Sequence, residues 1–386
     1  MNSSLAVYFL LGVAALPFIY YLIALYSSWR FFGQPPERTG KTPPVSVLKP
    51  IRGVDPEAYE NFASLCRQDY PEYEILFCVD RRDDPVVSVI DRLSSEFPLR
   101  NIRVLFGSGS TAPNDKVAKL RRLVDEAQNE VLVIGDSDVR VAPDYLRSVV
   151  GPLADPAVGA VTCFYLPTDD QRFAASLQAV GMVSDFYAGI LVAWQLDGVK
   201  FALGPTIATT RARLADFGGF AAIESRPGDD LLVGRLIADH GHEVKLIPYT
   251  VLKLAGYHTF GELLEKRMRW MVVMRHMRPW GHFGLLLTQG LPWSLAAIAI
   301  HPSAKIALAY LATYLLLRIA LTWSIGIRGL KRSRLWKEMS LIMVWDAVAF
   351  AIWGASFVRK KLRWRDADYY IRDGVLCPEP SSPTES

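Results

Sequence analysis

Four long apolar stretches constrain most strongly what this chain can fold into. The first runs from Leu5 to Tyr26 without a charged residue and is long enough to cross a ~30 Å hydrocarbon core. Three others lie near residues 283–300, 304–327 and 339–358. The sequence therefore predicts a globular domain over residues 30–280, held in a membrane by helices at both of its ends.

Charged residues around these stretches indicate how the chain is oriented. Arg30 and Lys41 follow the N-terminal helix, which is expected over residues 1–29, and the positive-inside rule places them in the cytosol. Arg318 and Asp346 interrupt two of the C-terminal stretches, and charges at that depth should face protein or a polar cavity. We expect an integral membrane protein with a cytosolic globular domain, in the inner membrane if the source is bacterial.

Basic segments flank the last apolar stretch on both sides, at residues 328–337 and 359–365. Both favour the cytosol, so a full crossing between them would place one on the wrong side. One C-terminal stretch, the first or the last, is therefore expected to be re-entrant or to lie in the interface, which leaves two to three membrane segments within residues 281–365. Residues 366–386 end in a run rich in Pro, Ser and Glu and are expected to be a disordered cytosolic tail.

Charge and cysteine content exclude several other classes of function. The net charge of +4 over 386 residues is too small to favour nucleic acid, and the Lys/Arg clusters lie beside apolar segments, where an anionic phospholipid surface is the simpler partner. The four cysteines have no CxxC spacing and no histidine cluster nearby. Neither a zinc site nor a disulfide framework is predicted.

The globular segment alternates short β-branched runs with helical patterns, which is typical of a doubly wound α/β domain. Such a sheet binds its ligands beyond the carboxyl ends of its strands. The expected buried strands are residues 45–48, 74–79, 102–106 and 131–134, and the expected helices between them are residues 56–67, 85–97 and 115–128.

Acidic residues follow two of these strands. Asp80 and Asp84 come after the second strand, although a helix cap before Pro85 would also explain Asp84. Asp136 and Asp138 come after the fourth, where alternating carboxylates suit Mg²⁺ or Mn²⁺ that also bridges to phosphate. A solvated turn is the alternative reading of this second pair.

Two further motifs lie later in the globular segment. Asp229 and Asp230 precede a helical pattern, so one of them can cap that helix while Asp230 faces a site as general base. Residues 263–278 read as a basic amphipathic helix in which Lys266, Arg269 and Trp270 share one face, suited to a diphosphate. A helix on the membrane surface, with its methionines in lipid, is the competing reading, and both can hold. Lys116, near the sheet edge, is a weaker candidate phosphate contact.

The order and spacing of these motifs resemble the ceramide glucosyltransferase family over roughly residues 44–280. The matching residues are Val45-Ser46-Val47-Leu48-Lys49-Pro50, Gly53-Val54-Asp55-Pro56, Asp69-Tyr70-Pro71, Asp83-Asp84-Pro85, Asp136-Ser137, Asp230 and Arg269-Trp270. Bacterial hopanoid-linked glycosyltransferases of the same superfamily have similar motifs. Two positions depart from the pattern: Lys266 stands where the family has Gln or Arg, and Asp138 completes a DxD that the animal enzymes lack.

This resemblance implies a GT-A fold and an inverting transferase that moves a hexose, glucose or N-acetylglucosamine, from a UDP-sugar to a lipid hydroxyl on the cytosolic face. The acceptor would be ceramide or a hopanoid polyol. Asp230 would be the catalytic base, and Asp136 and Asp138 would hold the metal. The expected donor contacts are Pro50, Asp80, Asp84, Lys116, Asp136, Lys266, Arg269 and Trp270.

Three alternatives to this reading are kept open. A processive polysaccharide synthase shares the motifs but needs more spanning helices, and a dolichyl-phosphate-type or soluble-sugar acceptor is compatible with the same donor site. A membrane receptor or transporter gives no reason for the acidic motifs. The sequence leaves the donated sugar and the oligomeric state open.

Overall fold

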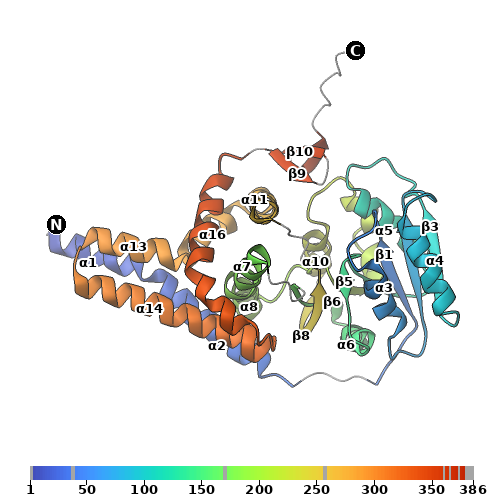
Figure 1. The fold of residues 1–386 in the computed structure, drawn as a ribbon, viewed down its shortest axis with the longest axis horizontal. Coiled ribbons are helices and arrows are strands. Elements are labelled where there is room, and N and C mark those ends of the chain that lie inside the picture. The colour runs from blue at the N-terminus through green and yellow to red at the C-terminus, as the bar shows by residue number, and fades with distance from the viewer. Residues whose placement is uncertain are drawn as a thin grey trace, which may run out of the picture.

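The computed structural model describes residues 3–35, 40–167, 172–254, 259–359, 361–364, 367–372 and 374–378. It has three parts: a sheet domain, a layer of helices along one side of it, and a helical bundle that projects beyond this layer (Figure 1). The remaining residues, which include parts of the expected 359–365 basic segment and of the tail, lie outside the described residues.

The first half of the sheet is parallel and confirms the four predicted strands. These are β1 (Val45–Pro50), β2 (Tyr73–Val79), β3 (Asn101–Phe106) and β4 (Val131–Ile134). The predicted helices between them are α3 (Ala58–Cys66), α4 (Val86–Glu96) and α5 (Asp115–Glu126). β1, β2 and β4 are buried along their whole length, which explains their near-continuous apolar sequences.

The second half of the sheet is mixed, so the expected doubly wound sheet is only partly parallel. The strand order is β3-β2-β1-β4-β7-β6-β8-β5, with β7 antiparallel to both β4 and β6. The additional strands are β5 (Val139–Arg140), β6 (Val158–Pro167), β7 (Ile207–Thr210) and β8 (Glu243–Lys253). Because β5 pairs with β8 immediately after the DxD motif, with Val139 opposite Lys253, the end of β8 lies beside Asp136 and Asp138.

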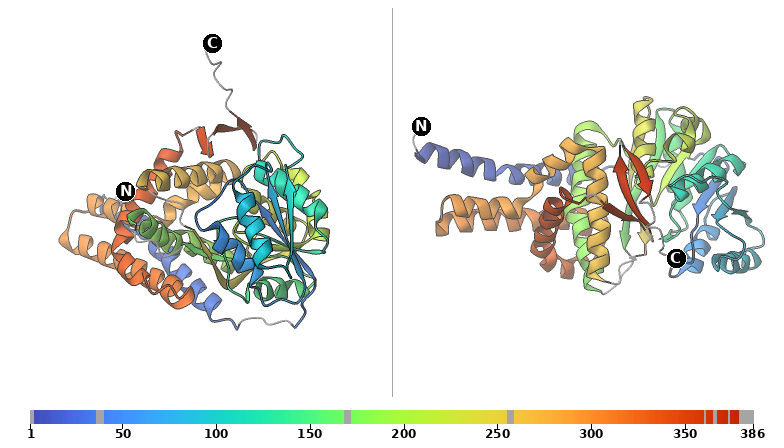
Figure 2. Two further views of the ribbon diagram at one scale, coloured as in Figure 1. Left: turned by 45° about the vertical axis from the view of Figure 1, so that its right-hand side comes forward. Right: turned by 90° about the horizontal axis from the view of Figure 1, so that it is seen from above.

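The projecting bundle contains α1 (Ser3–Ala14), α2 (Leu16–Phe32), α13 (Gly290–Ile300) and α14 (Ala304–Thr322) (Figures 1 and 2). Large apolar side chains point outward from it, with Phe9 69% and Leu308 72% exposed. Within the described residues four helices are long and apolar enough to cross a membrane, or up to five if the bent pair α12–α13 counts as one span. This apolar surface fits lipid rather than water.

A layer of helices runs across the base of this bundle, between it and the sheet (Figure 2). α7 (Phe173–Gly181) continues through a π-helical segment, η2 (Met182–Phe186), into α8 (Tyr187–Asp197), which makes a long helix that the sequence did not predict. α11 (Phe260–Met277) and α16 (Ile342–Ser356) pack beside α7. The predicted amphipathic helix therefore exists as α11.

Shorter helices connect these parts. They are α6 (Tyr145–Val150), η1 (Gly151–Ala154), α9 (Arg211–Ala215), η3 (Gly219–Ile223), α10 (Asp229–Asp239), α12 (Pro279–Gly284), η4 (Leu285–Thr288), η5 (Trp323–Gly329), α15 (Leu335–Glu338) and η6 (Met339–Leu341). The first C-terminal apolar stretch bends by 59° between residues 279–288 and 290–300.

A small antiparallel sheet lies on the outer side of α11, where the sequence predicted a disordered tail. Its strands are β9 (Lys361–Trp364), β10 (Ala367–Arg372) and β11 (Val375–Pro378). Ile371 and Leu376 bury Val272 of α11, and Met268 packs against the same cluster. The expectation of disorder was therefore wrong for residues 367–372 and 374–378, and the expectation of lipid contact was wrong for Met268, because this small sheet and α11 cover each other's apolar faces.

Arg318 and Asp346 pair with each other across α14 and α16, facing protein as the sequence predicted. Both are almost fully buried, and Arg318 donates from Nε to Asp346 Oδ2 over 2.9 Å and from a second nitrogen to Oδ1. Tyr314 also donates to Asp346, over 2.7 Å.

Breaking this ion pair from one side is expected to lower the free energy of unfolding by about 3 kcal/mol, because the partner charge stays buried without compensation. We expect Asp346→Leu to lower the thermal midpoint of the detergent-solubilised protein, and the double variant Arg318→Met/Asp346→Leu to recover most of that loss. A double variant no more stable than the single one would contradict this account.

Candidate active site

Two of the predicted acidic motifs meet at the side chain of Lys116. This lysine lies in the first turn of α5, with Nζ 3.0 Å from Asp136 Oδ1 and 2.8 Å from Asp229 Oδ2. It also interacts electrostatically with Asp230. The structure therefore brings the second and third acidic motifs together at the sheet edge, and Lys116 is central to the site rather than peripheral.

Lys253 holds the other side of Asp136. Its Nζ lies 2.5 Å from Asp136 Oδ2 and 3.2 Å from Asp138 Oδ1. Burial alone would raise the pKa of Asp136, but the ammonium groups of Lys116 and Lys253 hold it well below its usual range. Asp136 is therefore ionised at neutral pH.

Lys49, at the end of β1, lies beneath this pair. Its Nζ donates to the backbone oxygen of Asp136 over 2.7 Å. Burial lowers the pKa of Lys49 to about 8, against the opposing effect of Asp136 and Asp138. Gly135 gives the lysine room, since a Cβ there would lie 3.1 Å from Nζ.

Asp230 is fixed by two backbone N–H groups. Gly204 N donates to its Oδ2 over 3.0 Å, and Leu231 N to its Oδ1 over 2.9 Å. Burial and the neighbouring carboxylate of Asp229 raise the pKa of Asp230 to about 6. Asp229 pairs with Lys116 instead of capping α10, so its predicted role as a helix cap was wrong.

The carboxylate of Asp84 accepts hydrogen bonds from two backbone N–H groups. Its Oδ1 accepts from Val86 N over 3.0 Å at the start of α4, and its Oδ2 accepts from Gly53 N over 3.3 Å. This is the capping arrangement that the sequence offered as the alternative, and it also fixes the Gly53 loop after β1. A donor contact of Asp84 remains a prediction.

Replacing Asp84 with alanine is expected to lower the free energy of unfolding by about 1 kcal/mol, the usual effect of removing a helix cap. Asp84→Asn keeps one side-chain oxygen and should be less destabilised. Thermal unfolding of the two variants beside the wild type measures the difference; equal stability of all three would contradict the capping role.

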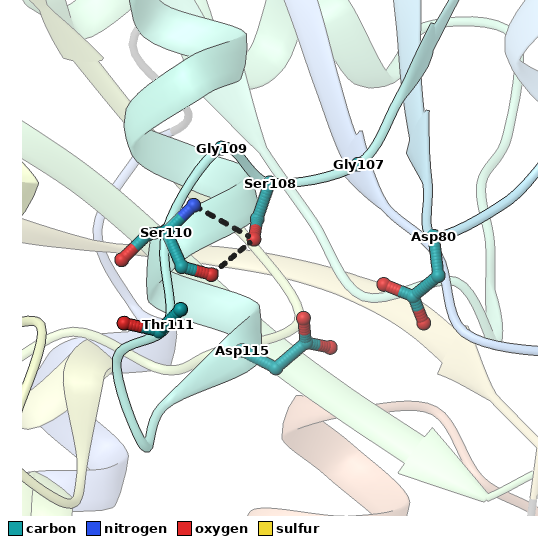
Figure 3. Close-up of a pocket in the computed structure, with 7 residues that line it drawn as sticks. All are labelled: Asp80, Gly107, Ser108, Gly109, Ser110, Thr111 and Asp115. Carbon is teal, nitrogen blue, oxygen red and sulfur yellow. Dashed lines mark hydrogen bonds between the residues drawn. The ribbon is translucent and has the colours of Figure 1, made fainter.

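A pocket with a volume of about 650 Å³ opens beside Asp80. Its wall is the loop after β3, residues 107–111, and the carboxylates of Asp80 and Asp115 face each other across it (Figure 3). Lys119 links the two, with Nζ 2.6 Å from Asp80 Oδ1 and 2.9 Å from Asp115 Oδ2. The pocket is open and polar; Pro50, the last residue of β1, lies opposite Cys78 of β2 and is not among the residues that line the pocket.

α11 brings its predicted face toward the acidic pair. Lys266 interacts electrostatically with Lys253 and Asp138, and burial together with Lys253 lowers its pKa to about 7. Lys266 Nζ lies 5.8 Å from the ring centre of Trp270. Arg269 is half-buried and close enough to Lys266 to affect its pKa. Both cations of the motif therefore lie at the site.

The carboxylates of the DxD motif fit a hard divalent cation. They supply oxygen ligands, and Asp138 Oδ1 is buried with no hydrogen-bond donor among the described residues, although Lys253 lies 3.2 Å away. No group of three or more Asp, Glu, His or Cys side chains arranged for a metal occurs in the described part of the chain. A cation here would complete its coordination with phosphate and water.

Sequence reasoning missed Lys253 and gave Lys49 no role. Lys49 is the second-last residue of β1 and Lys253 is the last residue of β8, and a lysine near the carboxyl end of a strand is the sequence signal that could have indicated them. The pairing of β5 with β8, which brings Lys253 to the site, joins residues more than a hundred positions apart.

Comparison with known proteins gives two kinds of relative. The profile of glycosyl transferase family 21 matches residues 9–377. Ceramide glucosyltransferase 3 of Caenorhabditis elegans is 23% identical over 286 residues, which covers 72% of this chain and 62% of that protein. The ceramide glucosyltransferase of Komagataella phaffii is 33% identical over 123 residues, covering 31% and 23%. The chain thus spans about three fifths of the length of the first relative.

The fold also has a solved counterpart. A mannosyltransferase from Pyrobaculum calidifontis, in complex with GDP-Man and Mn²⁺, superposes with a TM-score of 0.57 at 20% identity, covering 90% of this chain and 99% of that one. This likeness confirms the predicted GT-A fold.

Proposed function

Because the chain belongs to glycosyl transferase family 21, the resemblance to ceramide glucosyltransferases is confirmed, and we propose that it transfers a hexose from a UDP-sugar to the hydroxyl group of a membrane lipid, ceramide or a hopanoid polyol. The observation that carries the proposal is the convergence of Asp136, Asp229 and Asp230 on Lys116. A solvated turn or an isolated helix cap would not require carboxylates from two distant motifs to surround one lysine.

The donor is proposed to lie along the edge of the sheet. The polar pocket at Asp80 would take the nucleoside, whose hydroxyl groups can donate to the two carboxylates there. The diphosphate would then lie near Asp136, where Lys116, Lys253 and Arg269 supply positive charge.

Asp136 and Asp138 would hold Mg²⁺ or Mn²⁺, which when bound neutralises charge on the departing diphosphate. Lys116 and Lys253 hold both carboxylates of the motif in place. Lys266, in its protonated form, would attract the negative charge of the departing diphosphate. The chain's own lysines would thus stabilise the negative charge that develops on the diphosphate as its bond to the sugar breaks.

Asp230 is proposed to remove the proton of the acceptor hydroxyl. Its raised pKa makes it a better proton acceptor than an ordinary aspartate, while it is still ionised at neutral pH. A single displacement at the anomeric carbon, with the base on the acceptor side, would invert the configuration of the donor's sugar.

The membrane is proposed to surround the projecting bundle, with α11 and α16 lying along its cytosolic surface. The exposed apolar side chains of the bundle support this placement. α16 runs across the bundle rather than along it (Figure 2), which supports the last apolar stretch as the one that does not cross.

Calorimetric titration of the full-length protein with UDP and with GDP, each with Mn²⁺, tests the donor assignment. We expect UDP to bind at least tenfold more tightly than GDP, and EDTA to weaken both. Preferential binding of GDP would overturn the UDP-sugar assignment.

A further inference from the structure

Several buried polar atoms lack hydrogen-bond partners where α7, α11 and α16 meet. They are Arg267 Nε and Nη2 on α11, Trp345 Nε1 on α16 and Gln178 Oε1 on α7, none of which pairs with any atom of the described residues. The three side chains are only 8%, 2% and 5% exposed. Buried polar atoms are normally paired, so this cluster points to a ligand.

Arg267 is held by ring contacts that leave its N–H edge unused. Its guanidinium carbon lies 4.7 Å from the ring centre of Trp345 and 5.0 Å from that of Trp270. Trp345 itself packs against Gly181, where any side chain would overlap the indole ring. The two rings therefore hold the guanidinium in place, while Nε and Nη2 have no hydrogen-bond partner among the described residues.

Asp185 brings a carboxylate to the same place. It lies in the π-helical segment that interrupts the long helix. Of the arginines, it interacts electrostatically most strongly with Arg318, which is itself paired with Asp346, and next with Arg267, and it forms no ion pair with either arginine among the described contacts. The indole N–H of Trp345 lies near this carboxylate without the geometry of a hydrogen bond. π-helical segments of this kind are frequent at functional sites because they re-aim side chains.

The cluster adjoins the donor site on its membrane side. Trp270 contacts Lys266, which faces Asp138, on one side and Arg267 on the other. Phe186, next to Asp185, lies 6.1 Å from Trp270 between ring centres. Beyond the cluster, Arg318 donates to Ser184 and ties the same helix to the membrane bundle.

We propose that Arg267, Asp185, Trp345 and Gln178 form the subsite that holds the polar headgroup of the acceptor lipid. This inference rests on the proposed lipid acceptor. Arg267 and Trp345 donate to headgroup oxygens, and Asp185 and Gln178 accept from its N–H or hydroxyl groups.

The charges of the subsite select an uncharged headgroup. A phosphate would gain from Arg267 but would be repelled by Asp185, whereas an amide or hydroxyl group offers both a donor and an acceptor. Ceramide carries an amide and hydroxyl groups, and a polyol carries several hydroxyls, so both proposed acceptors have the required chemistry.

The test is native mass spectrometry of the full-length protein in detergent micelles that contain ceramide, with a hopanoid polyol and phosphatidylglycerol in separate arms. Arg267→Gln removes the two nitrogen donors, Nε and Nη2, that have no partner among the described residues. Arg275→Gln is the matched control, because it removes the same charge from the same helix, but Arg275 already donates to the backbone of Ser356 and Arg359.

For Arg267→Gln we expect retention of the neutral lipid to fall by roughly tenfold or more, the usual effect of losing hydrogen bonds from a charged donor. UDP affinity should not change, and the thermal midpoint should be equal or higher, since an unpaired buried charge is removed. Arg275→Gln should lower the thermal midpoint and leave lipid retention unchanged.

Unchanged retention in Arg267→Gln would overturn the subsite, as would an effect confined to phosphatidylglycerol or a wild type that retains neither neutral lipid. A wild type that retains the lipid through Arg267 but transfers no sugar to it would instead contradict the proposed function and leave the subsite standing.

Discussion

Replacing Asp230 with asparagine is expected to lower the rate of sugar transfer by about 10³-fold, within the usual contribution of a general base. The amide cannot accept the proton of the acceptor hydroxyl. Asparagine keeps one side-chain oxygen, which can accept from Gly204 N or from Leu231 N but not from both, so we expect a modest loss of stability and little change in UDP affinity. Initial rates with a labelled UDP-sugar, measured beside UDP titrations, separate the two effects.

The pH dependence of the wild type checks the same residue. Below a pKa of about 6 the Asp230 carboxyl is protonated and cannot act as a base, so kcat/KM should rise with pH through this value and level off above it. Asp239→Asn, at the other end of α10, is the matched control and should behave as the wild type. An Asp230→Asn variant with wild-type turnover would rule out this base.

Replacing Asp136 with asparagine is expected to abolish measurable transfer and to remove tight Mn²⁺ binding. The change takes away the central carboxylate of the metal pair and leaves Lys116 and Lys253 buried without their shared counter-charge. Because Lys116 keeps Asp229 and Lys253 keeps Asp138 as partners, the free energy of unfolding should fall by only about 2 kcal/mol. Mn²⁺ binding is measured by the electron paramagnetic resonance signal of free Mn²⁺, and stability by thermal unfolding.

Two further Asp→Asn variants show which effects are specific to Asp136. Asp138→Asn should weaken Mn²⁺ binding with a smaller loss of stability, because Asp138 pairs with Lys253 alone among the contacts described. Asp125→Asn, exposed on α5, should change neither property. Transfer by Asp136→Asn that is unaffected by EDTA would contradict the role of the DxD pair.

Much of the sheet and the acidic motifs could be predicted because local sequence determines them. The run that forms β4 is apolar throughout, and those of β1 and β2 are interrupted only by Ser46, Lys49 and Glu74, as expected of strands buried on both faces. Asp136 follows such a strand directly, so its place at the sheet edge follows from the strand itself. Trp270 and Lys266 share a face of α11 by simple helical spacing.

The features that escaped prediction depend on contacts between distant segments. Lys253 reaches Asp136 because β8 pairs with β5, and Asp229 pairs with Lys116 of α5, which lies far earlier in the chain. The long helix of residues 173–197 has little periodicity because it is covered on most sides. The strands after residue 360 are ordered by the apolar face of α11, which their own composition does not reveal.

Formation of a glycolipid is the direct test of the proposed transfer of a hexose from a UDP-sugar to a membrane lipid. Membranes that carry the full-length protein are incubated with labelled UDP-glucose or UDP-N-acetylglucosamine and with ceramide or a hopanoid polyol, and the lipid extract is analysed beside EDTA-treated and Asp230→Asn samples. We expect labelled lipid of inverted anomeric configuration from one pair of donor and acceptor, and no labelled lipid in the EDTA-treated and Asp230→Asn samples. No labelled lipid from any pair, or label in a polymer instead, would contradict the proposed transfer.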